Sequence, residues 1–142
     1  MLKEYLKENI QFAGQVSTWQ QAIRMAAEPM KARGDIKEGY IEAMIQNVLT
    51  NGPYIIIMPH LALPHARPET GVNCTGMSFL KLEKPVVFPE EKPVTVIIVL
   101  AAKGEDTHLE LLAELTDILM DEDKLKQLFA GTRKQEILEL MI

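Results

Sequence analysis

The sequence predicts an α/β fold: a single domain over residues 1–142, with helices flanking a central mixed β-sheet. Its length of 142 residues is that of one ordinary domain and is sufficient to bury a core. Segments rich in helix formers come first, short β-branched runs follow, and helical segments return at the end. No internal repeat, low-complexity segment or linker divides the chain.

The first helix is expected to begin at Ser17, because Ser17 and Gln20 have the spacing of a capping box. Gly34 is a typical C-terminal stop, and Pro29 should kink the helix between these limits. The first half of the chain is therefore interpreted as helical.

A second helix is expected over residues 38–50, where apolar residues recur with a helical period. Residues 54–58, YIIIM, are a β-branched run and predict a buried strand. Residues 76–82 and 94–102 predict two more strands, of which the second is the stronger. The predicted helices that follow the strands cover residues 107–120, 123–130 and 134–142.

Composition and charge exclude several classes of function. The net charge is −5 and lysines and arginines do not cluster, which argues against a nucleic-acid partner. Cys74 is the only cysteine, so there is neither an intramolecular disulfide nor a cysteine-based zinc site. The first residues are too charged for a signal peptide, and no apolar run could span a bilayer. We therefore expect a cytoplasmic protein that is connected with a membrane only through another protein.

Residues 58–69, MPHLALPHARPE, contain two histidines in a proline-rich turn behind a predicted strand. An imidazole is largely neutral at pH 7 and can form a covalent intermediate with a phosphoryl group. Pro64 and Pro68 restrict the backbone on either side of His65, as a surface nucleophile of fixed orientation requires. The structural alternative is a polar loop histidine that is hydrogen-bonded to backbone.

His108 follows the strongest predicted strand, where open α/β sheets tend to bind ligands. Thr107 and Glu110 have capping-box spacing, which would place His108 at the first helical position, beside free backbone N–H groups that favour a bound anion. The alternative is an ordinary surface histidine at a helix start.

Two long segments of the chain resemble a known family. GPYIIIMPHLALPHARPETGV (52–72), followed by LAAKGEDTHLELLAELTDIL (100–119), is similar to the enzyme IIA component of the bacterial phosphotransferase system, in its mannitol/fructose-type branch. The strings PYI, ALPHARPE and HLE are most similar to ascorbate-specific IIA proteins. The similarity covers nearly the whole chain and implies a type-2 IIA domain over residues 1–142.

This resemblance implies a phosphotransferase without a cofactor. His65 corresponds to the family's phosphorylated histidine, which accepts a phosphoryl group from the histidine phosphocarrier protein HPr. It passes the group to a cysteine of a cognate IIB protein, which feeds a sugar permease, IIC, so the permease is only an indirect partner. His108 corresponds to the second active-site histidine, which stabilises the phosphoryl group. The absence of a GxxxxGK loop agrees, because the donor is a protein and not a nucleotide.

The chain departs from the family pattern at two points. His60 stands where relatives usually have a glycine, and we interpret it as a rim or structural residue. Mannitol-type members also supply an arginine from the segment before the strand. This chain has no arginine there, so that role is either vacant or taken by Arg67. A salt bridge from Arg67 to Glu69 or another acid is the alternative.

Two other functions are compatible with the sequence. One is a regulatory IIA-like module of the nitrogen or fructose/mannitol type, which acts by phosphorylation-dependent protein binding. The other is a metal site of His60, His65 and His108, since three histidines are sufficient for a catalytic zinc. No HExxH or similar spacing supports the metal site, and we expect none.

Overall fold

The computed structural model describes residues 1–141, which form a five-stranded mixed sheet covered by helices on both faces. The sheet order is β1-β4-β5-β3-β2. The strands are β1 (Ile10–Ala13), β2 (Ile56–Met58), β3 (His60–Ala62), β4 (Gly76–Phe88) and β5 (Lys92–Ala101). The helices are α1 (Leu2–Leu6), α2 (Trp19–Ala32), α3 (Glu38–Asn51), α4 (Glu105–Leu119), α5 (Glu122–Ala130) and α6 (Lys134–Leu140), with 3-10 turns η1 (Pro68–Thr70) and η2 (Pro89–Glu91).

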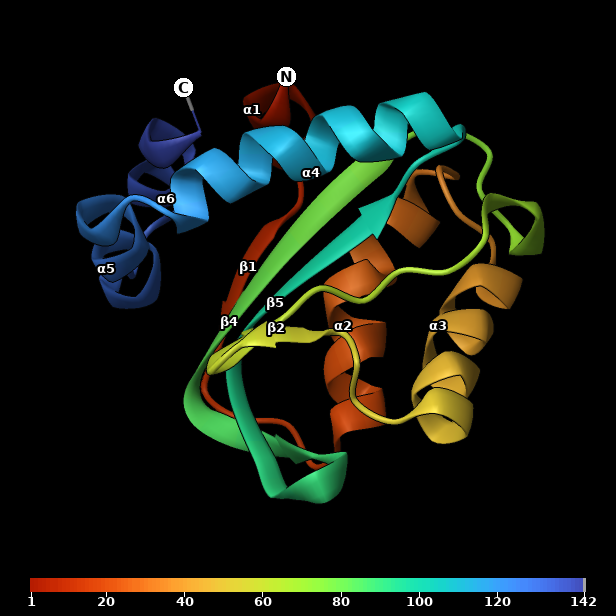
Figure 1. Cartoon of the computed structure of the whole chain (residues 1–142), viewed down its shortest axis with the longest axis horizontal. Coiled ribbons are helices and arrows are strands. Elements are labelled where there is room, and N and C mark those ends of the chain that lie inside the picture. Colours follow the sequence, from red (N-terminus) through yellow and green to blue (C-terminus); the bar gives the residue numbers. More distant parts are fainter. Residues whose placement is uncertain (142) are drawn as a thin grey trace.

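The sheet combines parallel and antiparallel pairs, as predicted. β4 and β5 form its long antiparallel centre, and β1 lies parallel to β4 at one edge (Figure 1). On the other side of β5, β3 runs parallel to it and is followed by the antiparallel edge strand β2. Because β3 and β5 are parallel neighbours, their carboxyl ends lie at the same end of the sheet, where a ligand site is expected.

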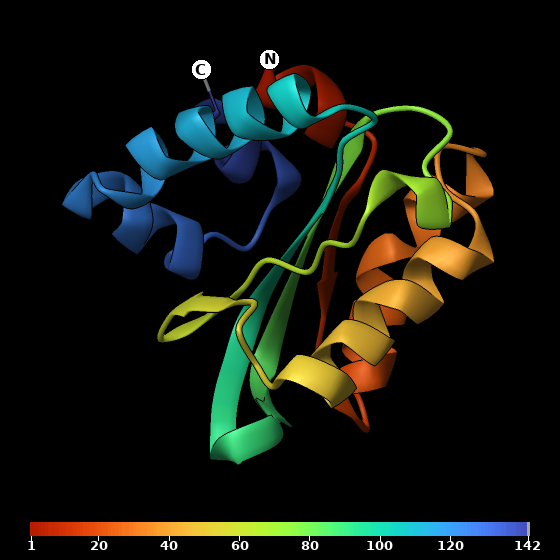
Figure 2. The ribbon, with the colours of Figure 1, turned by 45° about the vertical axis from the view of Figure 1, so that its right-hand side comes forward.

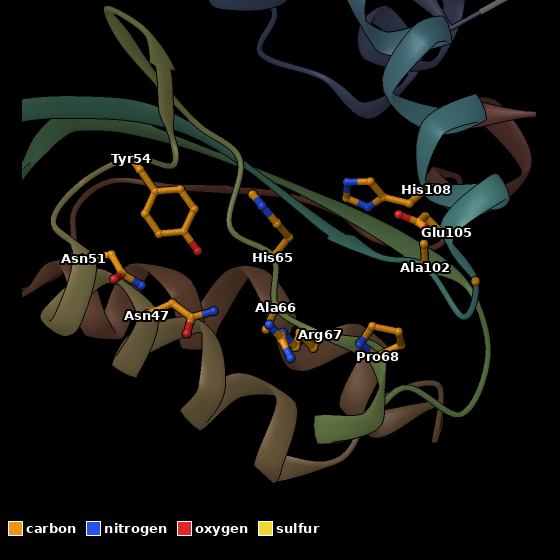
Figure 3. Close-up of a pocket in the computed structure, with 11 residues that line it drawn as sticks. Asn47, Asn51, Tyr54, His65, Ala66, Arg67, Pro68, Ala102, Glu105 and His108 are labelled. Carbon is orange, nitrogen blue, oxygen red and sulfur yellow. The ribbon is translucent and has the colours of Figure 1, made fainter.

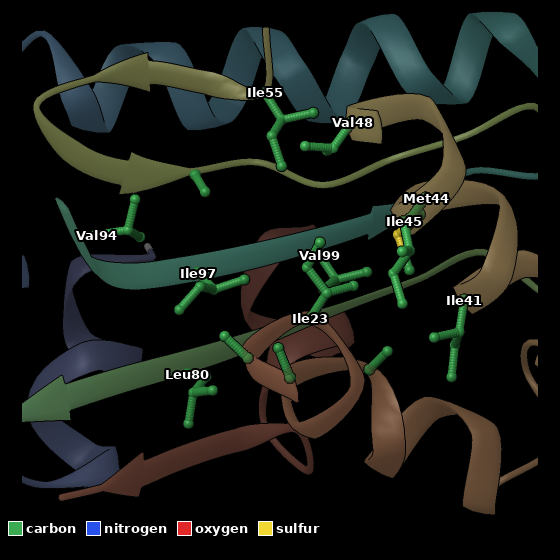
Figure 4. Packing of buried hydrophobic residues seen from close by; sticks show 14 of the residues in the cluster. Ile23, Ile41, Met44, Ile45, Val48, Ile55, Leu80, Val94, Ile97 and Val99 are labelled. Atoms are coloured by element: carbon green, nitrogen blue, oxygen red, sulfur yellow. The ribbon is translucent and has the colours of Figure 1, made fainter. Parts of the chain in front are cut away.

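The two faces of the sheet bury two separate cores. Alternate residues of β5 point to opposite faces, so that Ile97 and Val99 pack against α2 and α3 (Figure 4), whereas Ile98 and Leu100 pack towards α1, α4 and α6. Figure 2 shows α2 and α3 on one side of the sheet and the remaining helices on the other. With both faces covered, β5 is apolar and buried from Val96 to Ala101, which explains the strong strand signal of residues 94–102.

The predicted helices are present, with small shifts at their ends. α2 begins after Thr18 and not Ser17: the Thr18 hydroxyl accepts from the Gln21 backbone N–H at 3.1 Å, and the Gln21 side chain accepts from the Ser17 N–H at 2.7 Å. The N-cap is therefore one residue later than predicted, and the Gln21 side chain bonds the N–H before the N-cap, so the two reciprocal bonds of a capping box are not formed. α2 continues through Pro29 to Ala32, and Gly34 follows with a φ of 84°.

The edges of the sheet differ from the prediction. β1 lies in the part of the chain that is predicted to be helical, and this prediction is wrong. The four residues of β1 show no period of their own, and they form a strand because they pair with β4, which is distant in sequence. β2 is not the buried strand that the sequence predicts but an edge strand, and its Ile57 side chain is exposed. β3, which no local pattern indicates, forms a short hairpin with β2.

None of the helices within residues 1–141 is both long and apolar enough to cross a membrane.

Candidate active site: a pocket with two facing histidines

A pocket of about 610 Å³ lies at the carboxyl ends of β3 and β5, between α3 and the start of α4 (Figure 3). It is formed by residues from three separate stretches of sequence: Asn47, Asn51, Tyr54, His65, Ala66, Arg67, Pro68, Ala102, Gly104, Glu105 and His108. Two of the three histidines of the chain meet here. The structure thus brings together His65, His108 and Arg67, the three candidate residues of the sequence prediction.

The chain that carries His65 is held to its neighbours by backbone hydrogen bonds. The Leu63 N–H donates to the Ile55 carbonyl at 2.8 Å, and the Leu100 N–H donates to the Pro64 carbonyl at 3.1 Å. The second bond continues the contact between β3 and β5 beyond the last residue of β3. The backbone beside His65 is therefore attached to the end of β5, and the proline ring restricts the φ angle of Pro64.

The His65 ring has a defined orientation and tautomer. Its Nδ1 lies 2.8 Å from the carbonyl oxygen of Leu63. A carbonyl oxygen only accepts hydrogen bonds, so Nδ1 carries the hydrogen and, in the neutral ring, Nε2 carries the lone pair. The side chain is half-buried and lines the pocket. The sequence alternative of a loop histidine bonded to backbone is therefore correct about the bond, and this bond leaves the other ring nitrogen available as a nucleophile.

His108 faces His65 from α4. The centroids of the two rings are 5.7 Å apart and their planes are inclined by 52°. α4 begins at Glu105 with Gly104 as its N-cap, so His108 is the fourth helical residue and not the first, and its N–H donates to the Gly104 carbonyl at 3.0 Å. The predicted capping box of Thr107 and Glu110 is thus wrong, because the helix extends one turn further towards the strand.

The pKa of His108 is lowered from its ordinary value of 6.5. Partial burial is the largest cause, because it disfavours the charged ring, and the neighbouring His65 lowers the pKa further, whereas Glu105 raises it. His108 is therefore neutral near pH 7, and a neutral imidazole can donate one N–H to an anion in the pocket.

Tyr54 and Arg67 complete the surroundings of His65. The Tyr54 ring meets the His65 ring edge-on, with centroids 5.7 Å apart and an interplanar angle of 86°. Arg67 lines the pocket with an exposed side chain, and within residues 1–141 none of the ion pairs below 4 Å includes it. The predicted alternative of a salt bridge from Arg67 to Glu69 is therefore not formed, and the guanidinium can bind an anion.

His60 does not belong to this site. It is the first residue of β3 and lines a separate pocket with Pro59, Lys92 and Pro93. Its φ of 70° lies in the left-handed region, a conformation that glycine adopts more readily than other residues. Among residues 1–141, no group of three or more His, Cys, Asp or Glu side chains is arranged to hold a metal ion. A zinc site of all three histidines is therefore not formed.

Sequence reasoning missed the residues that α3 contributes. Asn47 and Asn51 are four residues apart and lie on one face of the helix, towards the pocket. This spacing is visible in the sequence, but only the tertiary packing of α3 beside the end of β3 shows that the polar face belongs to the site. Tyr54 is not the first residue of a strand, as the sequence predicts, but lies before β2 with its ring against His65.

The fold and the pocket define an α/β protein with two facing imidazoles and an arginine at the ends of parallel strands, an arrangement suited to binding an anion. The family model of the phosphoenolpyruvate-dependent sugar phosphotransferase system, EIIA 2, matches residues 4–142. The chain therefore belongs to the EIIA 2 family, whose members are phosphotransferase components.

Individual relatives agree with this assignment. The ascorbate-specific EIIA component of Escherichia coli K12 is 34% identical over 145 residues, which cover 99% of this chain and 94% of the relative. The mannitol-specific cryptic enzyme IIA component of the same organism is also 34% identical, with 99% and 97% covered. Its solution structure superimposes with a TM-score of 0.87 at 32% identity and the same coverage of both chains.

A further solved structure shows a relative with a partner. It is the complex of the mannitol enzyme IIA with phosphorylated enzyme IIB of E. coli, 29% identical to this chain, with a TM-score of 0.80 and 94% of each chain covered. These structures confirm the predicted mannitol/fructose-type fold.

Proposed function

We propose that the chain is a phosphoryl carrier of a sugar transport system, which accepts a phosphoryl group from HPr on His65 and transfers it to a cysteine of a cognate IIB protein. The observation that carries this proposal is the bond between His65 Nδ1 and the Leu63 carbonyl, which leaves Nε2 with the lone pair of a nucleophile in a ring whose centroid lies 5.7 Å from that of His108. Membership of the EIIA 2 family supports the same conclusion.

Each transfer exchanges one bond to phosphorus for another. In the first, His65 Nε2 attacks the phosphorus of the HPr phosphohistidine, the new N–P bond forms, and the N–P bond to HPr breaks. In the second, the thiolate of the IIB cysteine attacks the same phosphorus and His65 leaves as a neutral imidazole that retains its Nδ1 proton. The Leu63 carbonyl stabilises the partial positive charge on the phosphorylated ring through the Nδ1–H bond.

His108 and Arg67 act on the phosphoryl oxygens and not on phosphorus. The chemistry of phosphoryl transfer depends mainly on positioning and on charge stabilisation, because little covalent work remains for the protein. The neutral His108 ring donates an N–H towards the group on His65, and the Arg67 guanidinium at the pocket wall supplies positive charge. Arg67 thereby takes the place of the arginine that is absent before the strand.

The proposed sugar is ascorbate. An ascorbate-specific EIIA component is among the relatives, and the strings PYI, ALPHARPE and HLE resemble that group. We place the protein in the cytoplasm, where HPr and IIB would dock in turn, and the IIC permease is reached only through IIB. No nucleic acid takes part.

Phosphorylation of the intact chain tests this proposal. The protein is incubated with enzyme I, HPr and phosphoenolpyruvate, and its intact mass is followed. The expected result is the gain of one acid-labile phosphoryl group in the wild type and none in His65→Ala. The matched control is His60→Ala, which changes the other histidine of the same segment and should accept the group normally. No gain of mass under conditions that label a known IIA protein would refute the carrier function.

The sugar is tested in a second step. The phosphorylated protein is mixed with IIB proteins of ascorbate and mannitol systems, and the label on each cysteine is measured. Faster transfer to the ascorbate IIB supports the assignment, and faster transfer to the mannitol IIB overturns it while leaving the carrier function intact.

A further inference from the structure

We infer that Tyr40 is a positioning residue for the two-histidine site, because its hydroxyl joins the backbone beside His65 to the end of β5, from which the chain leads to His108. One test of this inference, the rate of phosphoryl transfer, rests on the proposed carrier function. The second test, the tautomers and titrations of the two imidazoles, does not.

The Tyr40 hydroxyl extends from α3 and contacts backbone of two other segments. It lies 2.6 Å from the Leu100 carbonyl oxygen, and the Ala66 N–H donates to it at 3.1 Å. The Ala66 carbonyl is a more distant acceptor at 3.4 Å. Since the hydroxyl has a single proton, the short contact to Leu100 identifies the acceptor that receives it. One hydroxyl thus accepts from the residue after His65 and donates to β5.

These contacts complete a clamp around His65 that uses a single residue of β5. The Leu100 N–H donates to the carbonyl of Pro64, the residue before His65. The Leu100 carbonyl is linked through the Tyr40 hydroxyl to the N–H of Ala66, the residue after it. Both neighbours of His65 are therefore tied to Leu100. On the first side the bond is direct, and on the second the hydroxyl bridges two backbone groups.

Leu100 of β5 also lies close in sequence to the helix that carries His108. Only Ala101, Ala102 and Lys103 separate Leu100 from Gly104, the N-cap of α4. A shift between Ala66 and Leu100 would change the separation of the two imidazoles, whose ring centroids are now 5.7 Å apart. The Tyr40 hydroxyl is therefore suited to fixing the geometry in which His108 meets a group on His65.

Burial keeps the Tyr40 hydroxyl of this bridge protonated under physiological conditions. Tyr40 has no exposed surface, and burial is the main reason why its pKa is raised to about 12. The phenol therefore keeps its proton and continues to donate to Leu100 at any physiological pH. If the hydroxyl were removed, the Ala66 N–H and the Leu100 carbonyl would each lose a partner in a half-buried or buried position.

Close packing holds α3 at the distance that the bridge requires. The Lys37 N–H donates to the Gly71 carbonyl at 2.8 Å, so the segment after His65 is attached to the start of α3. A Cβ atom at Gly39 would lie 2.8 Å from the Thr70 carbonyl oxygen, which shows that only glycine permits this approach. α3 therefore presents Tyr40 to the His65 segment from a fixed position.

The experiment compares Tyr40→Phe with Ile41→Val, a change in the adjacent and equally buried residue of α3 that leaves the hydroxyl in place. Tyr5→Phe removes a hydroxyl from a half-buried tyrosine in the opposite core and controls for the substitution itself. All are measured at a temperature at which circular dichroism shows them fully folded. The readouts are the rate of transfer from phosphorylated HPr, separated into kcat and KM, and the tautomers and pKa values of the histidines by NMR.

We expect Tyr40→Phe to lower kcat about tenfold or more, with KM for HPr nearly unchanged, since small displacements of reacting groups cost this much or more. Its His65 and His108 resonances should titrate differently from those of the wild type, whereas both controls should match the wild type. A Tyr40→Phe protein with wild-type kcat and wild-type histidine titrations would overturn the inference. If the wild type accepts no phosphoryl group, the carrier proposal fails, and the histidine titrations alone then decide whether Tyr40 positions the pair.

Discussion

His65 and His108 face each other across one pocket, yet the chain holds them in different ways. The His65 ring is bonded to the Leu63 carbonyl, and the backbone on both sides of it is attached to Leu100 or Tyr40. For the His108 ring, no side-chain hydrogen bond is present within residues 1–141, and its position depends on the course of α4. One imidazole is thus fixed in orientation and tautomer, and the other is placed but not bonded.

This difference matches two different tasks. A nucleophile must present a particular nitrogen along a particular line, so a fixed tautomer and a rigid backbone serve it. A group that stabilises a transferred anion benefits from being able to gain a proton when negative charge arrives. The lowered pKa of His108 keeps this ring neutral until then. Changes to each ring and its surroundings test whether the two imidazoles differ in this way.

The largest effect is expected from His108→Ala. Loss of a preorganised donor to a developing anion typically costs about 10²- to 10³-fold in rate, or about 3–4 kcal/mol of transition-state stabilisation. We expect His65 still to be phosphorylated, but much more slowly, as measured by rapid-quench mass analysis. His108→Gln retains an N–H donor and should recover part of the rate. Equal rates for the wild type and His108→Ala would show that the second imidazole has no part in transfer.

The next effect is a change in the titration of His108 when His65 is phosphorylated. In the free protein, burial and then His65 lower the pKa of His108. A phosphoryl group on His65 would replace that repulsion by attraction to a negative charge, so the pKa of His108 should rise. NMR titration of the ring before and after phosphorylation measures the shift. His65→Ala is the control, because burial alone should then keep the pKa low.

An unchanged or lower pKa of His108 in the phosphorylated protein would mean that this ring does not lie beside the phosphoryl group. The proposed division of tasks between the two imidazoles would then be wrong, although His65 could still be the carrier.

The sequence predicts the segment around His65 better than its surroundings. The prolines, the preceding β-branched run and the family strings are local signals, and they are sufficient to assign His65, Arg67 and His108 to one site. The predicted start of α4 is wrong because Thr107 and Glu110 imitate a capping box, while the true N-cap is a glycine without a capping side chain.

The parts that the sequence does not predict depend on distant contacts. β1 exists because it pairs with β4, and Tyr40 reaches the site because α3 packs beside the end of β5. Neither relation leaves a local signature. The two amides of α3, Asn47 and Asn51, have a helical spacing that the sequence shows, but their direction is set by the same packing.

A smaller effect is expected in the pH dependence of stability. The pKa of His108 in the folded protein is below its ordinary value of 6.5, so the unfolded chain binds the proton more readily. Well above pH 6.5 neither state binds this proton, so the group does not affect stability; as the pH falls through 6.5 towards the folded pKa, stability is lost. Urea unfolding of the wild type and His108→Gln between pH 8 and pH 5 measures this loss; we choose this range to bracket the ordinary histidine value.

The expected result is a wild type that loses more stability on acidification than His108→Gln, since the acidic side chains are the same in both proteins. Parallel pH profiles would show that the folded protein does not disfavour the charged form of His108, and the argument for a neutral ring at pH 7 would lose its support.

The smallest effect tests whether the backbone that orients His65 is already fixed at His60. His60 lies five residues before His65, has a left-handed φ of 70° and lines a different pocket. Glycine adopts this conformation without steric cost, whereas a Cβ atom costs roughly 1–2 kcal/mol in it, partly offset by the lower entropy of the unfolded chain. We therefore expect His60→Gly to exceed His60→Ala in unfolding free energy by about 1 kcal/mol, as measured by urea denaturation. Both variants should accept the phosphoryl group at the wild-type rate, because the bonds from Leu63 to Ala66 lie beyond the substitution. A tenfold slower transfer in His60→Gly would mean that the orientation of His65 is already set at the β2–β3 hairpin. The backbone that holds His65 more firmly than His108 would then include this turn.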